Sequence, residues 1–256
     1  MVKSAVFILA LATFATALPT EPIIDLTGSW RVVGGTDAAA GAYPFIVSLR
    51  SSSNSHFCGG TILNTGWVLT AAHCLVGSST ANVFVYAGSN QLNSGGITVA
   101  SSRLTIHGSY NPNTITNDVA VIQLASALTY SSTIAAVSLN TADTGSVSAI
   151  LAGWGRVSTN GAIPNNLQEL STNTLTHATC VQYWGSYVST SQICAVIGNG
   201  QGACNGDSGG PLIQASNNAQ LGIASFILAG GCAQGFPDVY VRVSSYASWI
   251  SNAISS

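Results

Sequence analysis

Three short motifs place a histidine, an aspartate and a serine along the chain in that order. His73 lies in the motif TAAHC, Asp118 in NDVA and Ser208 in CNGDSGGP. Taken singly, each has an ordinary structural explanation: a packed core histidine, a turn aspartate and a glycine-rich turn. A serine hydroxyl, however, needs a base to act as a nucleophile at neutral pH, and the base needs a carboxylate that fixes its tautomer. The three residue types together are therefore complete for nucleophilic catalysis.

Composition excludes several other functions. The 256 residues are 47% hydrophobic and only 5% charged, with a formal net charge of −2. Binding to nucleic acid or acidic lipid needs clustered Lys and Arg, whereas the single lysine here is Lys3, so we expect no nucleic-acid partner. The high hydrophobic content argues against intrinsic disorder and predicts a folded protein.

The N-terminal segment is typical of a secreted protein. Lys3 is followed by an apolar run that ends in small residues near Ala17, which predicts a signal peptide over residues 1–17. The alternative, a membrane anchor, needs about 18–20 apolar residues, so no membrane association is expected. Secretion to the extracellular space would let the six cysteines form three disulfides, although spacing alone allows 15 pairings.

An activation segment is predicted over residues 18–31. It is rich in proline and acidic residues and ends at Arg31, directly before the apolar sequence that starts at Val32. A single basic residue in a chain almost free of them predicts a zymogen that is cleaved after Arg31. The mature protein would then span residues 32–256.

The mature part shows short β-branched and apolar runs separated by Gly, Asn, Ser and Pro, which predicts an all-β sandwich or barrel. A terminal helix is predicted where apolar residues recur at helical spacing from Tyr246 to Ala253, after the candidate caps Ser244 and Ser245. The predicted strands are 45–49, 61–63, 67–70, 82–86, 119–124, 149–152, 221–226 and 239–243.

From Val32 to its C-terminus the chain resembles the chymotrypsin-like serine proteases. The resemblance rests on the three motifs above together with VVGG at 32–35, GWG at 153–155 and Ser225-Phe226. It implies two six-stranded antiparallel β-barrels and a C-terminal helix. His73 and Asp118 would lie on the first barrel and Ser208 on the second, with the active site between them.

The resemblance also implies a role for each residue. Ser208 would attack the scissile carbonyl, His73 would take and return the proton, and Asp118 would orient His73. Backbone N–H groups of Gly206 and Ser208 would hold the oxyanion, and Ser225 would support Asp118.

Activation and covalent bracing follow from the same resemblance. Cleavage after Arg31 by a trypsin-like protease would free the α-amine of Val32 to form a buried ion pair with Asp207. The resemblance pairs the cysteines as Cys58–Cys74, Cys180–Cys194 and Cys204–Cys232. A zinc site is disfavoured because no close cysteines have the two-residue spacing, and the loop 88–96 has no carboxylate for calcium. We therefore expect neither a metal nor another cofactor.

Substrate preference depends on the predicted specificity pocket. Its floor would be Gly202 and Ala203, where trypsin-like relatives carry an aspartate. One wall would be Ser225-Phe226-Ile227, and Ile227 would narrow the pocket in favour of small or medium apolar residues, as in elastase-like proteases. Asp238 has two interpretations: a pocket-facing acid, as in the arthropod brachyurins, that tolerates polar or basic residues, or a solvated loop acid.

These observations predict a secreted serine endopeptidase, in a digestive or general extracellular role, with an apolar preference before the cut. Its partners would be protein and peptide substrates, an activating protease and protein inhibitors, and the resemblance implies a monomer. The alternative is a catalytically silent homologue that acts as a binding or regulatory module. His56, His107 and His177 are expected to have only packing or surface roles.

Overall fold

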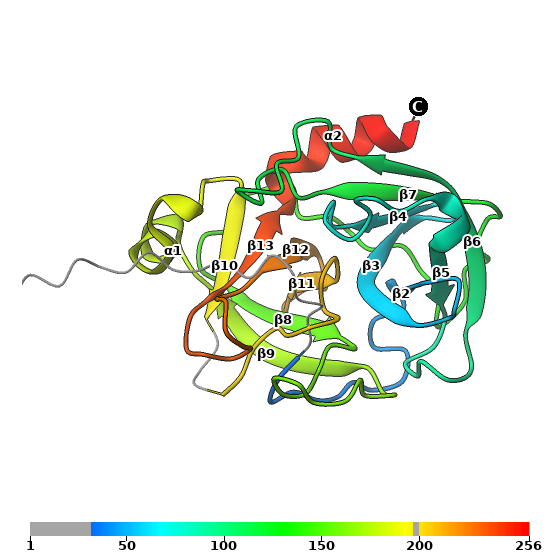
Figure 1. The fold of residues 1–256 in the computed structure, drawn as a ribbon, viewed down its shortest axis with the longest axis horizontal. Coiled ribbons are helices and arrows are strands. Elements are labelled where there is room, and N and C mark those ends of the chain that lie inside the picture. The colour runs from blue at the N-terminus through cyan, green and yellow to red at the C-terminus, as the bar shows by residue number, and fades with distance from the viewer. Residues whose placement is uncertain (1–31, 197–199, 256) are drawn as a thin grey trace, which may run out of the picture.

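Two closed antiparallel barrels of six strands each form the body of the molecule, which confirms the predicted all-β fold (Figure 1). The computed structural model describes residues 32–196 and 200–255. The predicted signal peptide and the activation segment with Arg31 lie outside these residues. The first barrel has the order β2-β3-β4-β7-β6-β5 and consists of β2 (Ile46–Arg50), β3 (His56–Asn64), β4 (Trp67–Thr70), β5 (Phe84–Ala87), β6 (Ile97–Ile106) and β7 (Ala120–Leu124).

The second barrel has the order β9-β10-β13-β12-β11-β8 and closes where β8 pairs with β9. The two-residue strand β1 (Thr36–Asp37) is added at β9, outside this ring. The strands of the ring are β8 (Ser148–Gly153), β9 (Gln168–Thr174), β10 (Gln192–Val196), β11 (Pro211–Gln214), β12 (Gln220–Phe226) and β13 (Asp238–Arg242).

The C-terminal helix α2 (Val243–Ser255) joins the two barrels. It begins directly after β13 of the second barrel, one residue before the predicted caps, and runs across the top of the view in Figure 1. Its buried residues Tyr246, Ile250 and Ala253 belong to the hydrophobic core of the first barrel. Burial of an apolar helix face is worth about 25 cal/mol per Å² of apolar surface, so α2 holds the barrels together.

A second helix, α1 (His177–Trp184), was not predicted from the sequence. Thr176 caps its N-terminus by accepting a hydrogen bond from the backbone N–H of Thr179 at 3.2 Å. Only Cys180 and Trp184 are buried, four residues apart on one face. Short 3₁₀ turns occupy Thr80–Asn82 and Gly185–Tyr187. The α-helices of residues 32–196 and 200–255 are α1 and α2, and neither is long and apolar enough to cross a bilayer.

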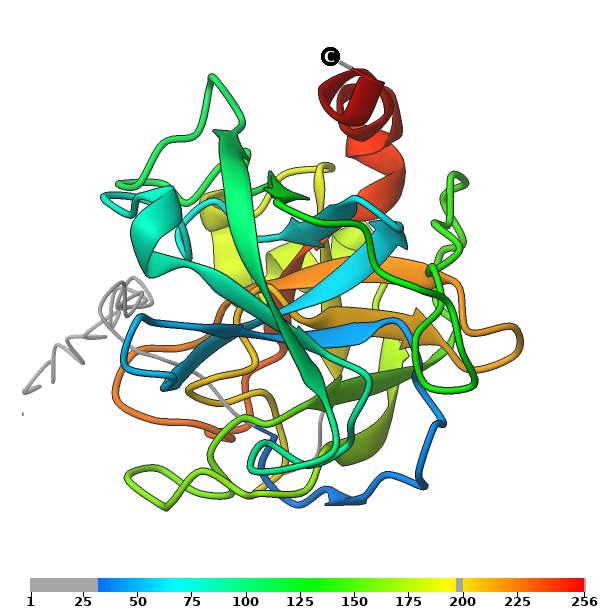
Figure 2. The same ribbon diagram turned by 90° about the vertical axis from the view of Figure 1, so that its right-hand side faces the viewer.

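Figure 2 shows the molecule turned by 90°, with the strands of the first barrel toward the viewer and α2 rising above them. The barrels meet where β3 faces the segment before β11: the backbone N–H of Gly59 donates to the carbonyl of Ser208 at 2.7 Å. Each barrel therefore brings one part of the candidate site to this contact.

Candidate active site

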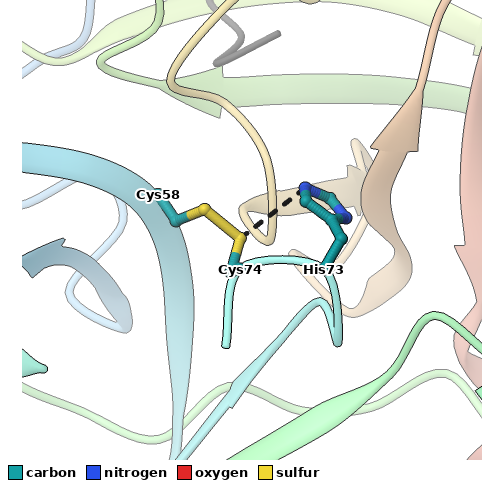
Figure 3. A group of neighbouring side chains, drawn as sticks. All are labelled: Cys58, His73 and Cys74. Atoms are coloured by element: carbon teal, nitrogen blue, oxygen red, sulfur yellow. Dashed lines mark hydrogen bonds between the residues drawn. A yellow bond between two sulfur atoms is a disulfide. The ribbon is translucent and has the colours of Figure 1, made fainter. Parts of the chain in front are cut away.

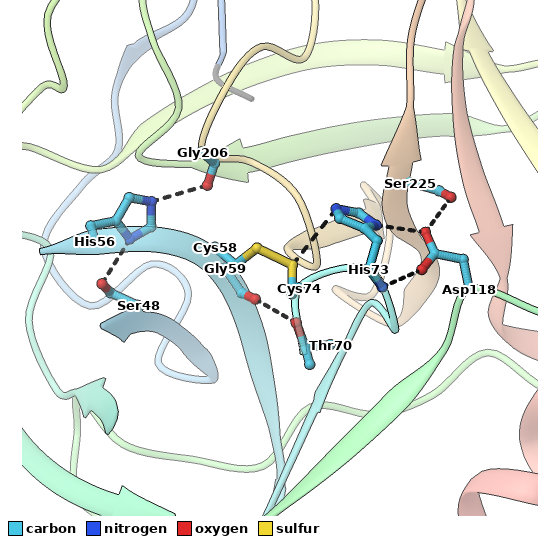
Figure 4. The surroundings of a disulfide bond; sticks show 10 residues. All are labelled: Ser48, His56, Cys58, Gly59, Thr70, His73, Cys74, Asp118, Gly206 and Ser225. Carbon is cyan, nitrogen blue, oxygen red and sulfur yellow. Dashed lines mark hydrogen bonds and ion pairs between the residues drawn. A yellow bond between two sulfur atoms is a disulfide. The ribbon is translucent and has the colours of Figure 1, made fainter. Parts of the chain in front are cut away.

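Strand register brings His73 and Asp118 together. Thr70 at the end of β4 pairs with Ala120 at the start of β7. His73 follows β4 by three residues and Asp118 precedes β7 by two, so the pairing brings them close together. Oδ2 of Asp118 accepts a hydrogen bond from Nδ1 of His73, and Oδ1 accepts from the backbone N–H of His73, both at 2.8 Å (Figure 4). Oδ2 accepts a second hydrogen bond, from Oγ of Ser225 in β12, at 2.6 Å. The fully buried carboxylate thereby holds the imidazole at both its ring and its backbone.

The electrostatics of this pair suit a general base. Burial by itself lowers the pKa of His73, but the attraction of the Asp118 charge and the hydrogen bond to it raise that pKa above the ordinary value of 6.5. The carboxylate also fixes the tautomer, because it accepts the proton on Nδ1 and leaves Nε2 to exchange protons with a substrate. The histidine ring is therefore oriented and made more basic by one neighbour.

Ser208 reaches the same place from the second barrel. Its segment is held on one side by Gly59 of β3 and on the other by Ala224 of β12, which accepts a hydrogen bond from the backbone N–H of Gly209 at 2.9 Å. Gly209 has φ +75°, and a Cβ there would collide with Oγ1 of Thr70. Glycine is thus required both by conformation and by the close approach of the two barrels.

The Ser208 hydroxyl is buried and makes no hydrogen bond to any atom of the described residues. Nε2 of His73 contacts Sγ of Cys74 at 3.7 Å instead (Figure 3). Catalytic hydrogen bonds are often loose without substrate. The structure therefore shows a hydrogen bond between His73 and Asp118 but none between His73 and Ser208.

The six cysteines form three disulfides: Cys58–Cys74, Cys180–Cys194 and Cys204–Cys232. The first ties β3 to the turn that carries His73, and its two sulfurs lie with a His73 ring nitrogen inside 4.8 Å of one another. That grouping has the residue types of a metal site, but the sulfurs are bonded to each other (Figure 3). Because metals bind the thiolate form of cysteine, this cluster offers only one ligand.

His56 has a role that the sequence did not reveal. Its Nε2 donates to the carbonyl of Gly206 at 3.0 Å, and its Nδ1 accepts from the hydroxyl of Ser48 at 2.8 Å (Figure 4). Gly206 has φ +113°, a conformation that favours glycine. His56 thus contacts the segment that carries Ser208, a contact beyond the packing or surface role expected from the sequence. No motif surrounds His56; the contact depends on the pairing of two barrels.

Val32 and Asp207, two of the predicted activation residues, are buried in the second barrel. Val32 is fully buried, and Val33 exchanges two backbone hydrogen bonds with Gly202, at 2.6 and 3.1 Å. Asp207 is fully buried as well, and its carboxylate accepts backbone N–H groups of Gly155 and Cys204, both at 3.0 Å. The new N-terminus that cleavage would create is therefore adjacent to residues already inside the fold.

A small cavity joins Ser208 to the predicted specificity residues. It measures about 10 Å³, room for a single water at most. Ile227 is buried with 6% of its surface exposed. Of the two residues expected at the floor, Ala203 lines the cavity and Gly202, which pairs with Val33, does not. The lining residues are Ala203, Ser208, Ala224, Ser225, Phe226, Ile227, Asp238, Val239 and Tyr240.

Asp238 is a buried residue of this cavity, so its interpretation as a solvated loop acid is wrong. It begins β13, exposes 4% of its surface and accepts a hydrogen bond from the backbone N–H of Ala203 at 2.6 Å. Burial raises the pKa of its carboxyl to about 8, against the lowering effect of that hydrogen bond. At neutral pH the cavity therefore contains a mostly uncharged carboxylic acid.

Helix α1 supports the cavity from behind. The indole of Trp184 packs edge-on against Phe226 with ring centroids 5.3 Å apart, and its Nε1 donates to the carbonyl of Pro237 at 2.9 Å. Phe226 and the residue after Pro237 both line the cavity. Trp184 thus holds two parts of the cavity wall, one at Phe226 and one next to Pro237. The only sequence signal for this role was the four-residue spacing between Cys180 and Trp184, which places both on one helix face.

Comparison with known proteins identifies the family. The trypsin family model matches residues 32–250. Chymotrypsin-2 of Vespa crabro is 43% identical over 223 residues, covering 86% of this chain and 98% of that protein. Trypsin alpha-4 of Lucilia cuprina is 38% identical over 262 residues, covering all of both chains, and trypsin beta of Drosophila erecta is 38% identical over 256 residues, covering 96% and 98%. These matches agree with the two six-stranded barrels, the His73–Asp118 pair and the nearby Ser208. They show that the chain belongs to the trypsin family of chymotrypsin-like serine proteases and is a serine endopeptidase.

Proposed function

We propose that this endopeptidase is secreted as a zymogen, becomes active on cleavage after Arg31, and cuts preferentially after small or medium apolar residues. The observation that carries the proposal is the position of Ser208, which lines the cavity of Ile227 and Asp238 and lies in the segment next to the His73–Asp118 pair. A digestive or general extracellular role agrees with three disulfides, which persist in oxidising compartments.

In the proposed reaction Oγ of Ser208 attacks the scissile carbonyl while Nε2 of His73 takes its proton. His73 then gives that proton to the leaving amine, the C–N bond breaks, and an acyl-enzyme remains. Water repeats the sequence: His73 takes a proton from water and the hydroxyl adds to the acyl carbon. The bond between that carbon and Oγ of Ser208 then breaks as His73 returns the proton to Oγ, which releases the carboxylic acid product. Asp118 stabilises the positive imidazole at both stages. Backbone N–H groups of Gly206 and Ser208 are the proposed donors to the oxyanion; one such donor is worth about 3–4 kcal/mol.

The proposed activation depends on a buried charge. A free α-amine at Val32 would enter a region where the carboxylate of Asp207 is fully buried. Removal of one partner from a buried ion pair commonly costs about 3–5 kcal/mol, so an ion pair between the α-amine and Asp207 would favour the ordered site. The proposal requires a trypsin-like activator, because the residue before the cut is arginine.

The proposed apolar preference follows from size and charge. Ile227 leaves little volume in the cavity, and one methylene in an apolar pocket changes rates by about 10- to 200-fold. Asp238 would attract Lys or Arg only as a carboxylate, but its raised pKa of about 8 keeps it largely neutral at pH 7. Ala, Val and Leu are therefore the residues that we expect before the cut at neutral pH.

A peptide library varied at the residue before the cut tests the whole proposal. Precursor is treated with trypsin, the new N-terminus is sequenced, and Ser208→Ala treated in the same way is the control. We expect activity only after treatment, an N-terminus at Val32, no activity in the control, and a preference for Ala, Val or Leu. A preference for Phe would refute the narrowed pocket, and an inactive but correctly processed enzyme would favour the silent homologue.

A further inference from the structure

A second and larger cavity lies on the first barrel, beside the active site. It measures about 500 Å³, within the range of sites that bind ligands. Arg50, Asn54, His56, Tyr86, Asn93 and Ile163 are among its lining residues. All its lining residues are uncharged or basic, so its electrostatic potential is set by Arg50.

Arg50 is a buried cation without a carboxylate partner among residues 32–196 and 200–255. It exposes 4% of its surface, and its guanidinium stacks 3.6 Å from the ring centroid of Tyr86. It donates to Oδ1 of Asn54 at 2.9 Å, to the carbonyl of Leu92, and to Oγ of Ser48 at 3.4 Å. All these acceptors are neutral.

A guanidinium has five N–H donors, and neutral acceptors on Ser48, Asn54 and Leu92 occupy three of them. The side chain of Tyr86 also interacts favourably with the charged guanidinium. Burial lowers the pKa of Arg50 from its usual high value, but an arginine stays protonated in proteins. Removing a charge from water without a counter-ion is unfavourable, and a bound carboxylate would relieve that cost through charge-assisted hydrogen bonds. The rigid, stacked guanidinium is therefore arranged for an anion.

The position of the cavity decides which part of a substrate can reach it. His56 lines the cavity and donates to the carbonyl of Gly206, in the segment that carries Ser208. Figure 4 shows His56 on one side of the Cys58–Cys74 disulfide, and Ser225, which lines the specificity cavity, on the other side with Asp118. A peptide with its acyl side at Ser225 and its scissile bond at Ser208 continues toward His56. The Arg50 cavity thus lies on the leaving-group side of the cut.

We propose that the Arg50 cavity binds a carboxylate of the leaving peptide, so that the enzyme favours an acidic residue among the second to fourth positions after the cut. This site rests on the proposed Ser208 chemistry but is independent of the preference before the cut. Asn54 and Asn93 add amide donors around the same cavity, as expected for recognition of carboxylate oxygens.

The test compares peptides that share one acyl half and carry Glu or Gln at the second, third or fourth position after the cut. Amidated and free-acid forms distinguish a side-chain carboxylate from a terminal one. At fixed ionic strength we expect kcat/KM to be about tenfold higher for Glu at one or more of these positions, or for the free acid, as for a hydrogen bond to a charged group.

Two variants assign the preference to Arg50. Arg50→Gln removes the cation, and we expect the ratio of kcat/KM for the Glu peptide to kcat/KM for the Gln peptide to fall to about one. Arg103→Gln is its control, since Arg103 also stacks on an aromatic ring of the first barrel, Trp67 at 5.0 Å, but does not line the cavity.

If Arg50→Gln fails to fold, Asn54→Asp gives the same information, because it places a carboxylate beside the guanidinium. Its control is Asn218→Asp, an equally exposed asparagine with the same left-handed backbone (φ 61° and 57°) outside the cavity. Asn54→Asp should abolish the preference and Asn218→Asp should keep it.

Equal rates for Glu and Gln and for both terminal forms in the unmodified enzyme would overturn the carboxylate site while leaving the proposed catalysis intact. A preference that survives in Arg50→Gln or Asn54→Asp would overturn the assignment to Arg50. Failure of the processed enzyme to cut any peptide of the set would instead refute the Ser208 chemistry, and the carboxylate site with it.

Discussion

Ser225 of the second barrel donates a 2.6 Å hydrogen bond to Asp118 of the first, on the carboxylate oxygen that also accepts from His73. The basicity of His73 therefore depends on a residue that the other barrel supplies. A hydrogen bond to a carboxylate disperses its charge, which weakens its attraction for a neighbouring proton. The contact between barrels thus adjusts the base as well as the position of the nucleophile.

Ser225→Ala should change the pH profile in a defined direction. Without this donor Asp118 attracts the imidazolium more strongly, so the pKa of His73 rises further and the acidic limb of kcat/KM against pH moves to higher pH. We also expect kcat to fall about tenfold, because the carboxylate loses one of its positioning hydrogen bonds. Ser171→Ala, an exposed serine on β9, is the control. A limb that moves to lower pH would contradict this account.

Ile227→Gly should open the specificity cavity. The side chain is buried and lines the 10 Å³ cavity beside Ser208, so its removal leaves room for an aromatic ring. We expect kcat/KM for Phe or Tyr before the cut to rise relative to Val by at least tenfold, as measured with paired substrates. Ile97→Gly, an exposed residue of β6, should keep the original profile. An unchanged profile in Ile227→Gly would show that this residue does not set the width of the pocket.

The chemistry of this site was easier to predict than the elements that carry it. The motifs around His73, Asp118 and Ser208 are local, and β4 matches its predicted range because all four of its residues are buried and apolar or β-branched. Strand β9 was missed because the residues it buries include Gln168, Thr172 and Thr174, so no apolar alternation appears. Strand β6 was missed for a related reason, since polar residues occupy its middle.

Contacts between strands and segments that are remote in the sequence were beyond the reach of sequence patterns. Asp238 had two open interpretations in the sequence, whereas in the structure it pairs with Ala195 of β10 and lines the pocket. Arg50 and His56 belong to no motif, and their significance depends on stacking over Tyr86 and on contact with the distant Gly206. Such residues become recognisable only when pairing brings remote strands together.

Asp238→Asn should change stability in a pH-dependent way. The folded pKa of about 8 is above the unfolded value near 3.9, so between these values the unfolded state releases a proton that the folded state keeps. The free energy of unfolding of the parent therefore falls as pH rises from about 4 to 8, and the variant lacks this loss. Both proteins are compared by calorimetry in a Ser208→Ala background. The Tm of Asp238→Asn minus the Tm of its parent should increase as pH rises from about 4 to 8.

Asp37→Asn provides a control of opposite sign for that measurement. Hydrogen bonds from Gln168 and then Asn166 lower the pKa of the exposed Asp37 carboxyl. Its stabilisation is present above the unfolded pKa and is lost as pH falls through the folded value, so this variant should be less stable than the parent at every pH from 5 to 8. A constant difference for Asp238→Asn over the same interval would show that its carboxyl is ionised in the fold.

Asp207→Asn should block activation without blocking processing. The carboxylate accepts N–H groups of Gly155 and Cys204, whereas an amide has one oxygen and directs its NH₂ toward the other donor. It also lacks the charge to pair with a free α-amine at Val32, a loss of about 3–5 kcal/mol, or roughly a hundredfold to several thousandfold in activity. Trypsin treatment should still yield an N-terminus at Val32, which sequencing detects. Asp143→Asn, an exposed acid paired with Arg242 at 2.8 Å, should retain activity. Full turnover by processed Asp207→Asn would show that the buried carboxylate does not order the site through this ion pair.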